Sequence, residues 1–244
     1  MTPTTTPTTT GRVAAVTGGA GAIGSAIADR LRIDGHTVVV LDRPRDDRDG
    51  GTDIGVDLAD ERSVRDAAAR VLDAYGRCDV LVHCAGAFET ADLRGLDTTI
   101  WRHVQAVNVE SALWLAQVFT PAMAQRGFGR IVFVTSDTQW EPPGPQLLPY
   151  IASKGALTAL TRVLARDLGA DGIAVTAIAP GLTDPPGSRT VNTEADFEAV
   201  VARQALRRRL TPADTADTVA FLATDAAAAL TGQTVCVDGG LVMR

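Results

Sequence analysis

A glycine-rich segment at residues 17–24 separates a short apolar run, residues 13–16, from an amphipathic segment that starts near Ile23 and ends near Gly35. The first run predicts a buried strand, and the 3.6-residue period of the second predicts a helix. Glycine lets the backbone turn sharply and approach a pyrophosphate, whose charge the helix N-terminus favours. The arrangement therefore predicts a dinucleotide-binding turn, with a tight turn that binds no ligand as the alternative.

The same alternation of short apolar runs and amphipathic segments continues along the chain. A helix is expected over residues 60–75, because Asp60 is a favourable N-cap and Gly76 a favourable stop. Further helices are expected over residues 98–124 and 150–168. The other expected strands are residues 37–41, a short strand before Asp57, and residues 80–84, 131–135, 174–179 and 234–237. This order predicts an α/β fold, a single doubly wound parallel sheet of Rossmann type.

Two parts of the chain fall outside regular structure. The Thr- and Pro-rich residues 1–11 are expected to be a disordered tail before one domain, residues 12–244. Residues 142–149 and 180–187 are rich in Pro and Gly and each follows a strand, so both should lie at the carboxyl edge of the sheet. Doubly wound proteins bind their ligands at that edge.

Composition excludes several classes of function. The 23 Lys and Arg against 29 Asp and Glu give a net charge of −6, so a nucleic-acid partner is not expected. The one basic run, Arg207–Arg209, is interpreted as a solvated helix end, with an anionic substrate or partner contact as the alternative. The cysteines show no metal or disulfide spacing, so we expect no metal, and Cys84 and Cys236 are interpreted as small core residues. Without a secretory signal or a membrane-length apolar stretch, we expect a cytoplasmic protein with no membrane contact.

Carboxylates near the glycine turn indicate how a dinucleotide would bind. Asp42 ends the second strand, where it can accept hydrogen bonds from ribose hydroxyls and repel a 2′-phosphate. This favours NAD, although the guanidinium of Arg43 could instead hold the phosphate of NADP. Asp57 could bind the adenine amino group, with Leu58 lining that pocket, or simply begin the turn before the next helix. His83 is interpreted as a buried histidine satisfied by backbone groups rather than as an acid or base.

Tyr150 and Lys154 stand at positions i and i+4, on one face of an expected helix. A tyrosine with an ordinary pKa near ~10 exchanges protons poorly at neutral pH, and a nearby cation lowers that pKa. An exposed lysine could not lower it to ~7 alone, so burial and a positive nicotinamide ring would have to contribute. By itself the pair is also compatible with an ordinary surface contact.

Taken together, these motifs identify the chain as a member of the short-chain dehydrogenase/reductase family, in its compact single-domain form. The resemblance covers everything after the tail. The matching residues are residues 17–24, Asp42, Asp57, Leu58, Ala85, Gly86, Asn108, Ser136, Tyr150, Lys154, Pro180, Gly181 and Asp238–Gly240.

The resemblance implies a role for each matched residue. Tyr150 would be the general acid/base, and Lys154 would bind the nicotinamide ribose and lower the pKa of the tyrosine. Ser136 would hydrogen-bond the substrate oxygen, and Asn108 would hold a helix kink and a water that links Lys154 to solvent. The implied cofactor contacts are Gly18, Ala22, Ile23, Gly24, Asp42, Arg43, Asp57, Leu58, Ala85, Gly86, Tyr150, Lys154, Pro180, Gly181 and Thr183.

Several positions depart from the family pattern. Ala22 replaces a glycine of the first turn, which fits if its backbone angle is negative. His83 and Cys84 stand where asparagines often precede Ala-Gly, and Thr176 also replaces an asparagine. Pro185 stands where a threonine is expected, with Thr183 as a shifted substitute. Tyr150 follows Ser136 by 14 residues, one more than the family pattern, which lengthens the substrate loop.

Substrate loops are expected at residues 137–149 and 182–205. Trp140, Leu147 and Leu148 would form an apolar wall for a ketone or secondary alcohol, or would pack against a neighbouring subunit. Residues 193–204 resemble a lid helix capped by Thr193. The last strand and turn often join subunits in this family, so we expect a homotetramer, or else a dimer, with the long helices paired.

Three functions remain open at this point. The first is an oxidoreductase that interconverts a ketone and a secondary alcohol with NAD(H). The second is a 3-oxoacyl-thioester or polyketide ketoreductase that uses NADPH, in which Arg207–Arg209 would contact a carrier. The third is a protein that senses dinucleotide without turnover, against which the complete Asn, Ser, Tyr and Lys set argues.

Overall fold

A computed structural model describes residues 11–43, 53–184 and 192–243. Of the expected tail only Gly11 is among them, and Pro185 lies outside the described residues. No helix of the described part is long and apolar enough to cross a membrane.

Seven parallel strands form a single sheet in the order β3-β2-β1-β4-β5-β6-β7. The prediction of one doubly wound parallel sheet is confirmed. The order reverses between β1 and β4, and ligands of such sheets bind beside the carboxyl ends at this reversal. The strands are β1 (Val13–Thr17), β2 (Thr37–Asp42), β3 (Ile54–Gly55), β4 (Val80–His83), β5 (Gly129–Val134), β6 (Ile173–Pro180) and β7 (Thr234–Val237).

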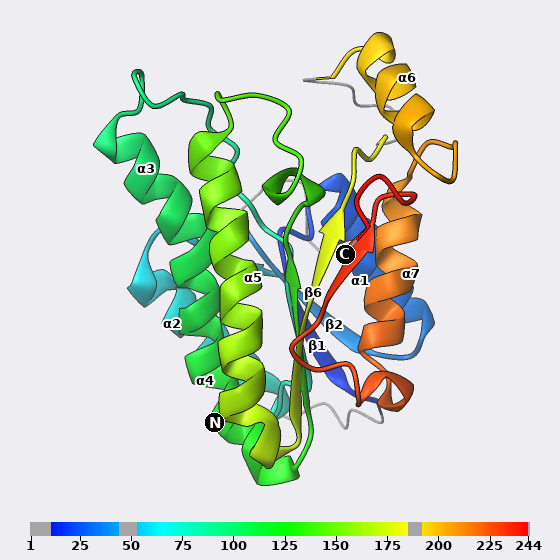
Figure 1. Cartoon of the computed structure of the whole chain (residues 1–244). Coiled ribbons are helices and arrows are strands. Elements are labelled where there is room, and N and C mark those ends of the chain that lie inside the picture. Colours follow the sequence, from blue (N-terminus) through cyan, green and yellow to red (C-terminus); the bar gives the residue numbers. More distant parts are fainter. Residues whose placement is uncertain (1–10, 44–52, 185–191, 244) are drawn as a thin grey trace.

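Helices cover both faces of the sheet (Figure 1). On one face lie α1 (Ala22–Ile33) and α7 (Pro212–Leu222), and on the other lie α2 (Glu61–Tyr75), α4 (Ser111–Arg126) and α5 (Leu148–Leu168). Beyond the carboxyl edge stand α3 (Thr98–Gln105) and α6 (Glu194–Arg203) (Figure 1). The short helical turns are η1 (Ala106–Glu110), η2 (Asp137–Gln139), η3 (Gly169–Asp171) and η4 (Asp225–Ala227).

Local sequence signals explain most of the helix ends. The Asp60 carboxylate accepts a hydrogen bond from the Ser63 amide, and Gly76 ends α2 with a φ of 66°, as predicted. Helix α5 starts at Leu148, two residues earlier than predicted, because Pro149 fits the first turn of a helix. The prediction that residues 142–149 are wholly irregular is therefore wrong at its end.

The single long helix predicted over residues 98–124 is divided. Helices α3 and α4 are joined by η1, one turn of π-helix. A π-turn inserts an extra residue into a helix and is often found at functional sites. Hydrophobic periodicity does not reveal it, because a π-turn adds only one residue to an otherwise α-helical stretch.

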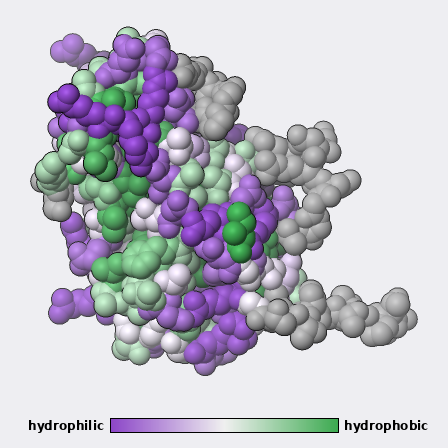
Figure 2. Space-filling view, turned by 90° about the vertical axis from the view of Figure 1, so that its right-hand side faces the viewer, coloured by the Kyte–Doolittle hydropathy of each residue, from purple (hydrophilic) through white to green (hydrophobic). Residues whose placement is uncertain are grey.

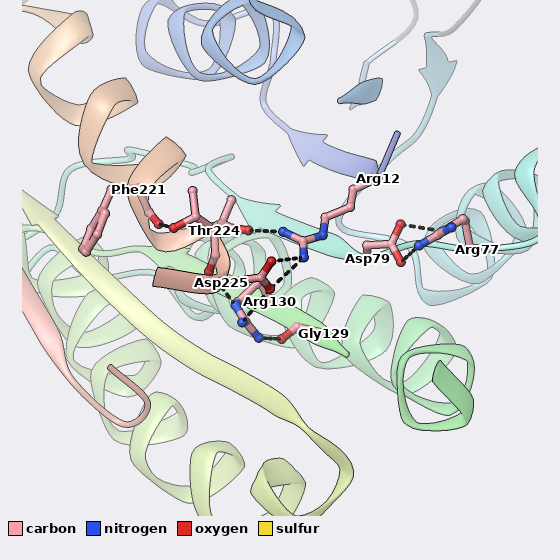
Figure 3. Close-up of polar contacts among 9 residues, drawn as sticks. Arg12, Arg77, Asp79, Gly129, Arg130, Phe221, Thr224 and Asp225 are labelled. Carbon is pink, nitrogen blue, oxygen red and sulfur yellow. Dashed lines mark hydrogen bonds and ion pairs between the residues drawn. The ribbon is translucent and has the colours of Figure 1, made fainter. Parts of the chain in front are cut away.

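Arginine side chains hold the amino edge of the sheet together, at the end opposite the ligand edge (Figure 3). Arg12 and Arg130 stack on the Phe128 ring, with 3.9 and 4.3 Å between each guanidinium carbon and the ring centroid. Both also pair with Asp225 of η4, but Asp225 is exposed, so these pairs contribute little. The pair of Arg77 with the buried Asp79 matters more, because Asp79 also accepts a hydrogen bond from the Val13 amide that starts β1.

Candidate active site

The turn after β1 closes tightly against the turn after β4. Gly18 has a φ of +67°, and a Cβ atom there would lie 2.7 Å from the Ala85 Cα atom. A Cβ atom on Gly24 would lie 2.1 Å from the Gly18 carbonyl oxygen. Both positions therefore require glycine. The hydroxyl of Thr17 joins the two turns by accepting hydrogen bonds from the amides of Cys84 and Ala85, each at 3.1 Å.

The N-terminus of α1 is open to an anion. Its N-cap, Gly21, has no side chain to cap the first-turn amides, and among the described residues no other side chain is seen to cap them. Ala22 is the first helical residue and has a negative φ, so its methyl group is accommodated as the sequence required. These features fit the pyrophosphate of a dinucleotide.

Asp42 lies directly against this turn. Its two carboxylate oxygens accept hydrogen bonds from the amides of Ala20 and Arg43, both at 2.7 Å. Asp57 accepts a hydrogen bond from the Ala59 amide at 2.9 Å, so it does form the turn before α2. Leu58 is buried in the hydrophobic core beneath α2.

Ser136, Tyr150 and Lys154 come together beyond the carboxyl ends of β5 and β6. The Tyr150 hydroxyl lies near Ser136, whose side chain lowers the pKa of the phenol, and the Ser136 oxygen accepts a hydrogen bond from the Thr138 hydroxyl at 2.9 Å. Lys154 is buried, its Nζ atom donates to the Val134 carbonyl at 2.8 Å, and it lies 5.4 Å from the centroid of the Tyr150 ring.

Burial shifts both titratable groups of this centre. It raises the pKa of Tyr150 to about 12, against the opposing effect of the Ser136 hydrogen bond, and lowers the pKa of Lys154 to about 8. Desolvation of the phenolate therefore opposes the lowering of the Tyr150 pKa that we expect from Lys154. The effect of Lys154 itself stays a prediction.

Asn108 occupies the middle of the π-turn η1, where the helix departs from regular α-helical geometry. Its side chain accepts from the Ala87 amide at 2.7 Å and donates to the Ala87 carbonyl at 3.1 Å and the Ser153 hydroxyl at 2.8 Å. Ser153 stands one residue before Lys154, so Asn108 ties the loop after β4 to the catalytic stretch of α5.

His83 at the end of β4 supports the same π-turn. Its Nε2 atom lies 2.8 Å from the Ser111 oxygen, and the Ser111 hydroxyl donates to the Val107 carbonyl at 2.7 Å. Because the single serine proton goes to Val107, His83 must donate from Nε2. Burial lowers the pKa of His83 to about 3, so the ring is neutral. The histidine is buried as expected, but its partner is a side chain rather than the backbone.

Ser111→Ala is expected to lower the free energy of unfolding by about 1–3 kcal/mol, because the buried His83 donor loses its acceptor. Since Asn108 shares this turn, the kcat of the oxidoreductase activity expected from the sequence should also fall by about tenfold through misplacement of Lys154. Thermal unfolding and steady-state rates measure the two effects. Thr218→Ala on α7 removes a comparable hydroxyl bond, to the Asp214 carbonyl, and should change stability only. Loss of stability in Ser111→Ala at unchanged kcat would contradict this role.

The expected substrate wall differs in part from the prediction. Leu147 is buried against the segment at Ala91, whose amide donates to the Gln146 carbonyl, whereas Trp140 and Leu148 are half-buried. Phe88, which the sequence did not single out, stacks edge-on against the Tyr150 ring at 4.6 Å between centroids and is 46% exposed. The only signal for it is its position two residues after Gly86.

Ion pairs hold α6 over this end of the molecule. Thr193 caps α6 in a capping box with Asp196, as predicted. Arg203 pairs with Glu141 of the loop after Ser136, and Arg209 pairs with Glu194. Figure 2 shows hydrophilic residues gathered at the end of the molecule where α6 lies.

The interpretation of Arg207–Arg209 as a helix end is wrong. These residues follow α6 in an irregular segment. Arg208 pairs with Asp214 of α7, and Arg209 pairs with Asp184 at 3.2 Å. From this irregular segment the guanidinium groups of Arg208 and Arg209 bridge to neighbouring elements.

The remaining expected contacts lie at the ends of β6 and β7. Pro180 ends β6, the Gly181 amide donates to the Val237 carbonyl at 3.0 Å, and the Thr183 hydroxyl donates to the Gly181 carbonyl at 3.0 Å. Within the described residues, no group of His, Cys, Asp or Glu side chains is arranged to hold a metal ion.

Comparison with known proteins agrees with this geometry. A family model described as enoyl-(acyl carrier protein) reductase matches residues 18–242. The short-chain reductase protein NovJ of Streptomyces niveus is 35% identical, over 93% of this chain and 93% of its own length. The chain belongs to the short-chain dehydrogenase/reductase family. It is therefore an NAD(P)-dependent oxidoreductase.

Two further relatives span nearly the whole chain. An acetoacetyl-CoA reductase of Allochromatium vinosum is 31% identical, over 96% of this chain and 99% of its own length. A short-chain dehydrogenase of Burkholderia cenocepacia, solved in complex with NADP, is 33% identical with a TM-score of 0.83, over 94% of this chain and 97% of that one.

Proposed function

We propose that this protein interconverts a ketone and a secondary alcohol with NAD(H), and that Tyr150 is the general acid/base. The observation that carries the proposal is the convergence of the buried Ser136 and Lys154 with the half-buried Tyr150 in one site, where Asn108 is bonded to Ser153 beside Lys154. When bound, the nicotinamide supplies or accepts the hydride.

The protein's own groups carry the proton chemistry. With a pKa of about 12, Tyr150 holds its proton at neutral pH, the form that can donate to a ketone oxygen. Ser136 donates a hydrogen bond to the same oxygen as negative charge develops on it. Because its pKa is about 8, Lys154 carries a positive charge at neutral pH. This charge stabilises the phenolate that forms when Tyr150 gives up its proton.

The dinucleotide is held along the carboxyl edge from β2 to β6. Asp42 accepts hydrogen bonds from the adenosine ribose, which favours NAD, because its carboxylate would repel a 2′-phosphate. The residues that hold the cofactor are Gly18, Ala22, Ile23, Gly24, Asp42, Arg43, Asp57, Leu58, Ala85, Gly86, Tyr150, Lys154, Pro180, Gly181 and Thr183.

The test is a panel of aryl ketones, aliphatic ketones and 3-oxoacyl thioesters, followed by nicotinamide absorbance with NADH and NADPH in parallel. Ketone-dependent oxidation of NADH is the expected result. Rates with NADPH that equal or exceed those with NADH across the panel would contradict the role of Asp42.

A second candidate is a 3-oxoacyl-thioester or polyketide ketoreductase that uses NADPH. It is favoured by the names of relatives, among them the acetoacetyl-CoA reductase, and by the NADP bound to the Burkholderia protein. Fast turnover of a carrier-linked ketone beside weak turnover of simple aryl ketones would select it. The ion pairs of Arg208 and Arg209 leave these side chains less available to a carrier than the sequence suggested.

The active form is a homotetramer, or else a dimer, that pairs the outer sides of α4 and α5. The support is that both helices cover the same face of the sheet (Figure 1) and that Val163 of α5 is 64% exposed. A mass near the single-chain 25.5 kDa in sedimentation equilibrium would overturn this assembly.

A further inference from the structure

Asp137 is a buried carboxyl group beside the reaction centre that no step above uses. It directly follows Ser136 and is 5% exposed. Its Oδ1 atom lies 3.4 Å from the Ser136 oxygen, at the long end of hydrogen-bond distance. Within the described residues no lysine or arginine forms an ion pair with it.

The neighbouring carboxylate, Asp238, has hydrogen-bond donors for both of its oxygens and serves as a comparison. It is also buried, and its two oxygens accept hydrogen bonds from the amides of Gly240 and Val242 at 2.9 and 2.8 Å. Asp137 has no such pair of close amide donors, because its hydrogen bonds come from the Ser136 hydroxyl at 3.4 Å and from the Thr138 amide. Burial, followed by repulsion from Asp238, raises the pKa of Asp137 to about 7. A carboxyl group buried beside a second carboxylate is costly, and such groups in proteins commonly serve a ligand.

Two observations place this carboxyl beside the expected position of the substrate. A Cβ atom on Gly181 would lie 3.1 Å from its Oδ2 atom, so it borders the turn after β6. Its charge is also among the groups that raise the pKa of Tyr150. Asp137 therefore lies close to both hydroxyls proposed to hold the substrate oxygen.

We propose that Asp137 determines specificity by accepting a hydrogen bond from a hydroxyl or ammonium group that the substrate carries next to its carbonyl. The inference rests on the proposed function. Because Oδ1 lies 3.4 Å from the hydroxyl that binds the carbonyl oxygen, the donor must sit within one or two carbon atoms of that carbonyl. A plain ketone leaves the buried carboxyl without this partner. The preferred substrate is thus polar near its reacting carbon, although Trp140 offers an apolar surface further out.

Three matched ketones test this: α-hydroxyacetophenone, α-aminoacetophenone as its hydrochloride, and α-methoxyacetophenone, which has no donor. We expect the wild type to show a kcat/KM at least about tenfold higher for the hydroxy or amino ketone than for the methoxy ketone, as for a hydrogen bond to a charged group. Asp137→Ala should remove this preference and leave the methoxy ketone unchanged or faster. Preference for the amino over the hydroxy ketone would identify an ammonium donor, and the reverse a hydroxyl donor.

The controls separate specificity from folding. Asp137→Asn has nearly the same shape, and its neutral oxygen should keep part of the hydroxy preference but lose the amino preference. Asp171→Asn removes an equal charge at an exposed position and should change no ratio. Neither Asp137 variant should lower the thermal midpoint, because each removes a buried acid that is repelled by Asp238.

Each of the following outcomes would overturn the inference. Equal kcat/KM for all three ketones in the wild type would reject it and leave the proposed function intact. An equal loss of kcat/KM with all three ketones in Asp137→Ala would mean that Asp137 positions Ser136. Weaker NADH binding by fluorescence, with an unchanged ratio of kcat/KM among the ketones, would mean that Asp137 supports the cofactor. If the wild type binds dinucleotide and reduces no ketone, both this inference and the proposed function fail.

Discussion

Tyr150→Phe is expected to lower kcat for ketone reduction by about 1,000-fold while the affinity for NADH changes by less than about twofold. The phenyl ring keeps its edge-on contact with Phe88, so packing is preserved, and only the proton donor is lost. Stopped-flow absorbance measures the rate, and fluorescence titration measures the affinity.

Below pH 8 the wild-type reduction rate should be nearly flat, because Tyr150 stays protonated there. It should decline as pH rises through the Lys154 pKa of about 8, because the cation is lost.

The chain carries its own control for this experiment. The sequence has two tyrosines, and the other one, Tyr75, ends α2. Tyr75→Phe should leave kcat unchanged. Full reductase activity in Tyr150→Phe would remove the tyrosine from the mechanism. A different outcome would identify a sensor. In that case the wild type shows no turnover, and Tyr150→Phe still binds dinucleotide and keeps every other function.

Asp42→Ala is expected to shift the ratio of kcat/KM for NADPH to that for NADH by about 100-fold in favour of NADPH. The reason is that repulsion between a carboxylate and a phosphate dianion at close range amounts to several kcal/mol at the protein surface, before screening by salt. The measurement is steady-state kinetics with both cofactors at fixed ionic strength. The variant also loses the acceptor for the Ala20 amide, so its thermal midpoint should be recorded.

Asp73→Ala is the matched control for Asp42→Ala, because it removes the same charge from an exposed position on α2. Its cofactor ratio should equal that of the wild type. If Asp42→Ala leaves the ratio unchanged, or if the wild type already prefers NADPH, Arg43 rather than Asp42 controls the choice of cofactor.

Local chemistry explains why much of the fold could be predicted. The caps of α2 and α6 were correct, because a side chain such as Asp60 or Thr193 reaches amides only two or three residues away. Strand positions followed from short apolar runs covered on both faces. The start of α5 was missed by two residues, since a Pro-rich stretch can both end a loop and begin a helix.

Contacts between distant segments explain what was missed. Phe88 meets Tyr150 across 62 residues of chain, and His83 meets Ser111 across 28. No period or spacing rule links such pairs. The same holds for Asp137, because the sequence shows the residue type but not its burial close to Asp238 and Gly181.

The sequence alone determined the family, the doubly wound sheet, and the set of Asn108, Ser136, Tyr150 and Lys154, because short-range patterns and residue order carry that information. Only the tertiary structure decided how burial acts on this set. Burial raises the pKa of Tyr150, Asn108 lies in the middle of a π-turn, and Asp137 is buried directly beside Ser136. Desolvation and hydrogen-bond partners depend on every element packed around a group, and packing exists only in the folded chain.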